Sequence, residues 1–144
     1  MENATMGRVI VSAKIENLGD ILLANAGHRK AEDVRSLEVP DALVDNGSTR
    51  LAMPRSLIEQ LGFTKFGVER GRTANGIREF GLYGPARLTV QDRFCVVDVS
   101  ELPNECPVLI GQVPLELMDW VVDPKGQRLI GNPAHGGEWM SDMF

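Results

Sequence analysis

Turn signals divide this chain into short segments, and their close spacing is what most limits the folds open to it. The strongest is Asn75-Gly76, a dipeptide that favours a tight hairpin turn between strands at 70–74 and 77–82. Alternating apolar and polar residues at 86–90 predict a strand, and a second predicted strand at 94–99 follows after a short turn. The two predict another hairpin. Short strands joined by close turns predict a mostly β protein, built as a small barrel or a folded sheet.

Weaker patterns add strands on both sides of these hairpins. Further strands are predicted at 9–15, 21–24, 34–39, 42–44, 107–111, 120–123 and 127–130. The segment 21–24 could pair back with 9–15 across a turn at Asn17–Asp20. Pro40 is expected to end the strand before it, and the tail from Gly131 lacks periodicity, which indicates disorder or dependence on a partner.

Two short helices are predicted, at 53–62 and 114–119. In the first, Pro54 suits the opening helical position and Gly62 the stop. The hairpin around Asn75-Gly76 is polar and has few apolar side chains to bury, so we expect it to project and to move.

Composition narrows the function classes. The 144 residues suit one domain, and 43% hydrophobic with 24% charged residues is ordinary for a folded protein. A net charge of -5 disfavours nucleic acid or an anionic membrane as the main partner, and no apolar run approaches the ~20 residues that span a bilayer. The start Met1–Thr5 lacks the pattern of a secretion signal, and Cys95 and Cys106 make neither a disulfide scaffold nor a zinc cluster. We therefore expect a cytoplasmic protein without cofactor or metal.

The stretch 42–49 contains the strongest candidate for chemistry. An apolar run ends in Asp45, which Asn46-Gly47-Ser48 follow at once as a tight-turn sequence. A strand that delivers a carboxylate to a loop with accessible backbone amides can hold a reactive acid, although an ordinary surface turn also fits these residues. The acids at 98, 119 and 123 lack the following turn glycine and are interpreted as solvated or structural.

Other nucleophile schemes have little support in the sequence. Cys95 lies mid-strand and is interpreted as a core residue, while His28 and His135 lie in polar segments far apart in the chain. The chain contains no Gly-x-Ser-x-Gly, P-loop or dinucleotide fingerprint.

The order of these elements resembles the retroviral-type (retropepsin-like) aspartic proteases and their bacterial single-domain relatives. That family combines an apolar-apolar-Asp-Thr/Ser-Gly turn, a helix ending Leu-Gly, a glycine-tipped flap and an apolar-apolar-Gly strand. Here residues 41–130 follow the pattern, within a single domain expected over 1–130 and followed by a tail at 131–144. The resemblance implies a small closed-barrel acid-protease fold with two short helices and a flap hairpin.

The matching positions can be named one by one. The resemblance implies Asp45 as the catalytic acid, in an active-site turn formed by Asn46, Gly47 and Ser48. It implies a substrate-binding flap formed by Ala74, Asn75, Gly76 and Ile77. It also implies a supporting strand formed by Leu109, Ile110 and Gly111. One position departs from the pattern. Asn46 replaces the Thr or Ser whose hydroxyl ties the two catalytic turns together across the dimer, and an Asn amide places its donor and acceptor one bond further out.

The implied activity is that of an aspartic endopeptidase acting on an extended peptide or unfolded protein. Such chemistry needs two carboxylates that share one proton, a case for which these enzymes are the standard example. Since this sequence offers one acid in the required context, the resemblance implies a homodimer with Asp45 contributed by each subunit. The alternative is a catalytically weak or inactive module of the same fold that binds peptides or only dimerises.

Overall fold

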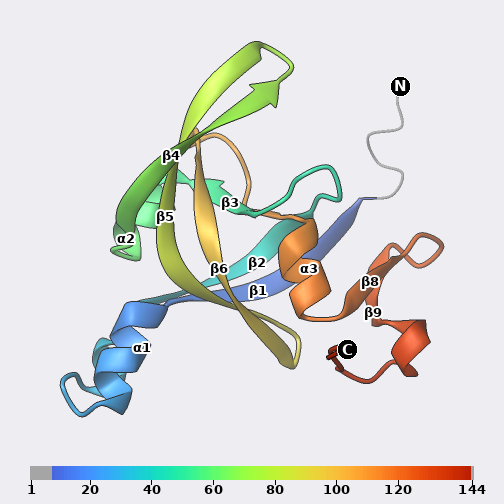
Figure 1. Cartoon of the computed structure of the whole chain (residues 1–144), viewed down its shortest axis with the longest axis horizontal. Coiled ribbons are helices and arrows are strands. Elements are labelled where there is room, and N and C mark those ends of the chain that lie inside the picture. The colour runs from blue at the N-terminus through green and yellow to red at the C-terminus, as the bar shows by residue number, and fades with distance from the viewer. Residues whose placement is uncertain (1–7, 144) are drawn as a thin grey trace.

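The computed structural model describes residues 8–143, and the protein is mostly β with a few short helices (Figure 1). In chain order the elements are β1 (Val9–Asn17), α1 (Leu18–Asn25), the 3-10 helix η1 (Ala31–Asp33), β2 (Ser36–Val44), β3 (Leu51–Pro54), α2 (Arg55–Gln60), β4 (Thr64–Thr73), β5 (Gly76–Val90), β6 (Arg93–Leu102), β7 (Leu109–Ile110), α3 (Gln112–Leu117), β8 (Trp120–Asp123), β9 (Arg128–Gly131) and the 3-10 helix η2 (Pro133–His135). The predicted mostly β class is confirmed.

Seven strands form one sheet in the order β1-β2-β7-β3-β6-β5-β4. Because β1 also pairs with β5, the pairings return to their starting strand and make a ring, and β4 continues outward from β5. The first forty residues therefore contribute strands to the ring. Fully buried side chains such as Ile15, Leu88 and Ile110 fill its interior.

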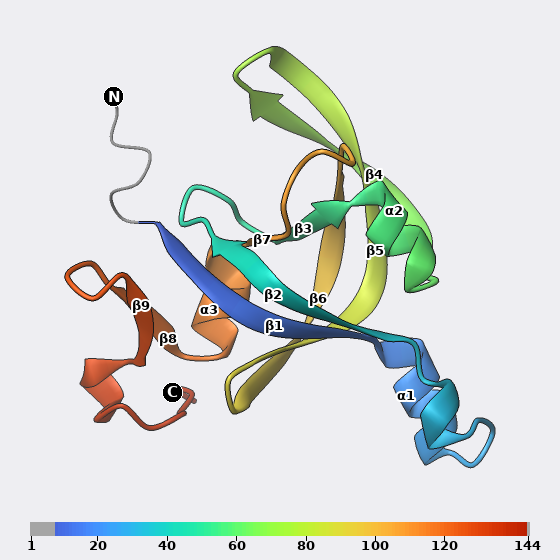
Figure 2. The same ribbon diagram turned by 180° about the vertical axis from the view of Figure 1, so that it is seen from behind.

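The two hairpins predicted around Asn75-Gly76 and Gln91-Asp92 are confirmed as β4–β5 and β5–β6. Figure 1 shows the β4–β5 hairpin rising above the ring, as expected for an arm with few apolar side chains to bury. Seen from behind in Figure 2, α1 lies at the opposite end of the molecule from the hairpin tip. Strands β8 and β9 pair with each other in a separate two-stranded sheet.

The predicted strand at 21–24 is wrong, because this segment belongs to α1. The Asn17 side chain accepts a hydrogen bond from the backbone N–H of Asp20 at 3.0 Å, which is the geometry of a helix N-cap. Its amide also donates to the carbonyl of Leu61 at 2.9 Å. The residues interpreted as a hairpin turn therefore begin a helix.

Pro40 does not end its strand as predicted, since β2 continues from Ser36 to Val44. The register explains why. Val39 lies opposite Ala13 and Ala42 lies opposite Val11, so two residues of β2 face one residue of β1. Proline is tolerated at such a bulge because its missing N–H is not needed there for a ladder hydrogen bond.

Three further expectations about the elements need correction. Residues 8–143 form three α-helices where two were predicted, because α1 was missed. The helix predicted at 53–62 spans Arg55–Gln60, with Met53 and Pro54 in the strand β3. Its N-terminal proline is the N-cap residue, one position before the place expected.

The tail beyond Gly131 is folded against the rest of the protein, which corrects the expectation of disorder. It forms η2, and Arg93 donates to the carbonyl of Gly137 at 2.6 Å. The Trp139 ring packs edge-on against Phe94 with ring centroids 5.3 Å apart. The sequence expectations for Met1–Thr5 and for Phe144 lie outside the described residues.

Candidate functional site

The predicted acid lies in the loop between β2 and β3, and β7 lies between those two strands. Strand β7 runs parallel to β2, with Val44 opposite Ile110, and antiparallel to β3, with Leu51 opposite Ile110. The backbone N–H of Asp45 donates to the carbonyl of Ile110 at 3.0 Å. The apolar strand predicted to support the Asp45 turn is therefore in contact with it.

Gly111 fits closely against the same loop. Its N–H donates to the carbonyl of Arg50 at 2.9 Å, and an added Cβ would lie 2.5 Å from that oxygen and 2.7 Å from the carbonyl oxygen of Ser48. Both neighbours are backbone atoms, so a side chain at position 111 would require the loop to shift. This contact explains the glycine at the end of the apolar strand.

The start of α3 is anchored on the loop as well. The N–H groups at the start of a helix have no partner within the helix. Here the N–H of Gln112 donates to Ser48 O at 2.8 Å and that of Val113 to Thr49 O at 3.0 Å. The loop that carries Asp45 is thus held through its backbone by both β7 and α3.

The Asp45 carboxylate is oriented by the turn that follows it. The Gly47 N–H donates to Oδ1 at 2.9 Å, and the Ser48 hydroxyl donates to Oδ2 at 3.0 Å. An added Cβ at Gly47 would lie 3.2 Å from Oδ1, so a larger residue would crowd this bond. The carboxylate is half-buried and fixed in direction, with one side toward solvent.

Asn46 points away from this network. It is exposed, and its side chain has no hydrogen bond to any described residue. Its amide is therefore available to a group outside this chain.

The predicted flap residues form the tip of the β4–β5 hairpin. The Thr73 hydroxyl donates to the Gly76 carbonyl at 2.7 Å and accepts from the Asn75 N–H at 3.1 Å, which closes the turn. Gly76 has a φ of 102°, a conformation that glycine adopts readily. Ala74, Asn75, Gly76 and Ile77 are all exposed, and the Ile77 side chain is 59% exposed.

A hollow of about 180 Å³ lies between the loop and the hairpin. Its walls are Ser48, Thr49, Arg50, Ala52, Glu69, Gly71, Phe80, Ser100, Leu102 and Leu109. The structure thus brings two of the predicted site residues, Ser48 and Leu109, to one hollow, while Asp45 and the hairpin tip are not among its walls. A larger hollow of about 510 Å³ along β1 contains none of the predicted site residues.

Sequence reasoning missed Arg50, Glu69 and Phe80 as parts of this hollow. Arg50 forms ion pairs with Glu69 at 3.0 Å and with Asp98 at 3.4 Å. Its partners are 19 and 48 residues away in the chain, so no local pattern could have found them.

Among the described residues two acids, Asp20 and Asp119, are buried, and both have structural partners. Asp20 accepts from Arg29 at 2.6 Å and from Arg35 at 2.8 Å, and the hydrogen bond from Arg35 lowers the pKa of Asp20 to about 2. Asp119 accepts from Asn132 and bonds His135 at 2.6 Å, which lowers the pKa of Asp119. Neither carboxylate is free to serve as a partner for Asp45.

The remaining candidate groups are inert or scattered. Cys95 is buried in β6, and its desolvation raises the pKa of the thiol to about 12. Within residues 8–143 no cluster of His, Cys, Asp and Glu could hold a metal ion. In the same range, each helix is too short or too polar to cross a membrane.

Comparison with models of known protein families gives no match to this chain, and the search of curated proteins gives none either.

Proposed function

We propose that this protein is a retropepsin-like aspartic endopeptidase, in which the ring of strands is the small closed barrel of that fold. The observation that carries the proposal is the Asp45 turn. Its carboxylate is fixed by Gly47 N–H and Ser48 Oγ, and the backbone of its loop is locked by Gly111. A half-buried acid with both oxygens oriented and one side open is suited to bind a water molecule.

The chemistry requires a second carboxylate, and the proposal takes it from a second copy of the chain. An isologous dimer places equivalent residues beside each other on its two-fold axis. Two adjacent carboxylates cannot both ionise readily, so the pair shares one proton. The ionised member takes a proton from water as that water attacks the peptide carbonyl carbon, and the protonated member donates to the carbonyl oxygen. Breakdown of the tetrahedral intermediate returns a proton to the leaving nitrogen.

The β4–β5 hairpin is the proposed flap, and an extended peptide is the proposed substrate. A peptide lying between the hairpin and the Asp45 loop can form backbone hydrogen bonds as an added strand does. Phe80, Leu102 and Leu109 give the hollow an apolar wall that suits an apolar substrate side chain. With its thiols free, the protein fits the reducing cytoplasm, where we expect it to act.

The alternative is a non-catalytic module that binds extended peptides or only dimerises. Asn46 favours this alternative, because a planar amide replaces the small hydroxyl that ties the two turns together in the family pattern. Asn46 is exposed, and its side chain has no hydrogen bond to a described residue that would take over that tie.

A peptide library distinguishes the two functions. Wild type, Asp45→Ala and the matched control Asp92→Ala, an exposed acid in the β5–β6 turn, are incubated with the library at several pH values. The proposal predicts cleavage by wild type and Asp92→Ala and none by Asp45→Ala. Peptides that bind but remain intact with all three proteins would support the binding module.

A further inference from the structure

Arg50 connects the loop that carries Asp45 to the β4–β5 hairpin. Its backbone is fixed, because its carbonyl accepts the Gly111 N–H at 2.9 Å. Its guanidinium bonds Glu69 on β4 through two nitrogens, with Nη2–Oε2 at 3.0 Å and Nε–Oε1 at 3.4 Å. Two-point pairing of this kind orients both side chains.

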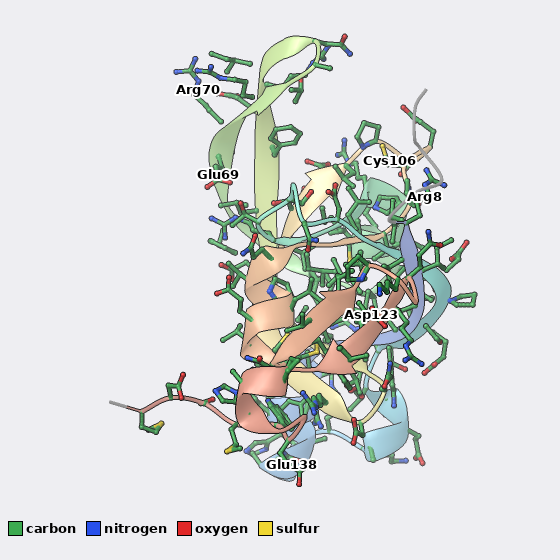
Figure 3. All side chains as sticks on the ribbon, turned by 90° about the vertical axis from the view of Figure 1, so that its right-hand side faces the viewer. Arg8, Glu69, Arg70, Cys106, Asp123 and Glu138 are labelled. Carbon is green, nitrogen blue, oxygen red and sulfur yellow. The ribbon has the colours of Figure 1, made fainter. Side chains whose placement is uncertain are left out.

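The hairpin has few other attachments. We call residues 69–80 the hairpin arm. Strand β4 pairs only with β5, and among the described residues the Glu69–Arg50 pair is the one side-chain hydrogen bond or ion pair from β4 to a residue outside the β4–β5 hairpin. Figure 3 shows Glu69 nearer the base of the projecting hairpin and Arg70 nearer its tip. The pair therefore lies where a small movement at the base becomes a larger one at the tip.

Arg50 has a second acidic partner. Its Nη1 lies 3.4 Å from Oδ2 of Asp98 on β6. Strand β6 belongs to the ring, so Asp98 stays in place when the hairpin lifts. If Glu69 moves away, Arg50 keeps a carboxylate partner, and the arm can open without leaving the guanidinium unpaired.

We propose that Arg50 is a positioning residue that latches the hairpin arm in its closed position through Glu69 and retains Asp98 as its partner when the arm opens. This inference rests on the proposed function, in which a peptide enters between the arm and the Asp45 loop. The latch then sets how often the entrance opens, while Asp45 performs the chemistry.

The two carboxylates have opposite effects on the opening equilibrium. Glu69 stabilises the closed arm only, so Glu69→Gln raises the open population about two- to fivefold, the range expected for a partly exposed ion pair. Asp98 is the remaining carboxylate partner of Arg50 in the open state, whereas in the closed state it shares the guanidinium with Glu69 and therefore matters less. Asp98→Asn therefore lowers the open population.

The first measurement is NMR relaxation dispersion of the arm amides in the 144-residue chain. Glu79→Gln is the matched control, because Glu79 lies on the same arm, is exposed and has no ion pair among the described residues. Raising the ionic strength should increase the open population of wild type and leave that of Glu69→Gln unchanged. The latch is refuted if Glu69→Gln has the same open population as Glu79→Gln. It is also refuted if Asp98→Asn raises the open population as much as Glu69→Gln does.

The second measurement is the association rate of a library-selected peptide in the Asp45→Asn background, where cleavage does not interfere. Entry through a rarely open arm makes this rate proportional to the open population. Glu69→Gln should raise it by the same factor as the population, and Asp98→Asn should lower it. If the open populations of the arm change as predicted but the protein binds no peptide, the proposed function is refuted and the latch is not. If the protein cleaves peptides but its open population does not respond to Glu69→Gln and Asp98→Asn, only the latch is refuted.

Discussion

At the scale of single residues, Gly47 and Ser48 orient the Asp45 carboxylate, whereas the side chain of the neighbouring Asn46 has no hydrogen bond within the part of the chain that the structure describes. In the family pattern the hydroxyl at that position bonds the opposite turn, so Asn46→Thr should raise kcat and tighten the proposed dimer. Each restored hydrogen bond would contribute about 0.5–1.5 kcal/mol, and displacement by about 1 Å in an active site can cost on the order of a hundredfold in rate. The comparison needs kcat and the dimer Kd for wild type and Asn46→Thr. Asn25→Thr, at the exposed end of α1, is the control, and activity that stays undetectable in all three favours the binding module.

Gly111 is the residue on which the loop geometry depends most. The Cβ of Gly111→Ala would meet the carbonyl oxygens of Arg50 and Ser48 at 2.5 and 2.7 Å. We expect the free energy of unfolding to fall by about 1–3 kcal/mol, the usual range for an overpacked site, and any peptidase activity to be lost with the displaced Asp45. Urea unfolding measures the first effect. Gly67→Ala is the control, because its Cβ would have open space and the backbone φ of residue 67 lies outside the left-handed region. This substitution should change the free energy of unfolding far less.

At the scale of elements, the docked tail should respond to pH. The hydrogen bond to Asp119 raises the pKa of His135 above 6.5, and Asp142 faces the same ring at 3.4 Å. Because the pKa of His135 is raised in the docked tail, protonated His135 stabilises docking fully below about pH 6.5. This stabilisation is lost as the pH rises through the higher pKa that His135 has in the docked state.

The measurement is the fluorescence of Trp139, which packs on Phe94 only while the tail is docked. Raising the pH from about 6 to about 9 should change this signal in wild type and in the control His28→Gln, whose histidine is exposed. In His135→Gln the pH step should disappear. A step that persists in His135→Gln would mean that another group controls docking.

The elements that the sequence predicted correctly are those with local signals. Asn75-Gly76 specifies its hairpin through backbone preference alone, and the apolar strand before Gly111 is short but unbroken. The misassigned elements depend on distant contacts. Asn17 caps α1 while bonding Leu61, and the tail is ordered by Arg93 and Asp119, neither of which lies nearby in the sequence. Pro40 could remain in a strand only because β2 bulges at this point, where two of its residues face one residue of β1.

The residues of the candidate site also fall into those with a local sequence signal and those that depend on distant contacts. Asp45, Gly47 and Ser48 could be identified because they form a contiguous turn, and Gly111 because a glycine ending an apolar strand matches a known pattern. Arg50, Glu69 and Phe80 meet only after β3, β4 and β5 have folded. Their side chains give no sequence signal that separates them from ordinary surface residues.

At the scale of the whole molecule, any peptidase activity should survive chelators and thiol reagents. The described residues hold no cluster of metal ligands, and burial keeps the Cys95 thiol protonated with a pKa of about 12. The assay compares cleavage with and without EDTA and a thiol-alkylating reagent. Cys106→Ser is the control for side effects at the more accessible cysteine. Inhibition by EDTA that added metal reverses would contradict an aspartic mechanism.

If two subunits each contribute Asp45 to one active site, mixing wild-type and inactive subunits should suppress cleavage. Wild-type protein at fixed concentration is equilibrated with increasing amounts of inactive Asp45→Asn, and the cleavage rate is measured once subunits have exchanged. With a ninefold excess of the variant, only roughly a tenth of the wild-type chains pair with each other by random association. With one Asp45 needed from each subunit, the cleavage rate should fall to about that fraction of its starting value. A rate that stays constant as the inactive variant is added, with exchange verified by mass-labelled subunits, would show that each chain works alone and would contradict a site shared by two subunits.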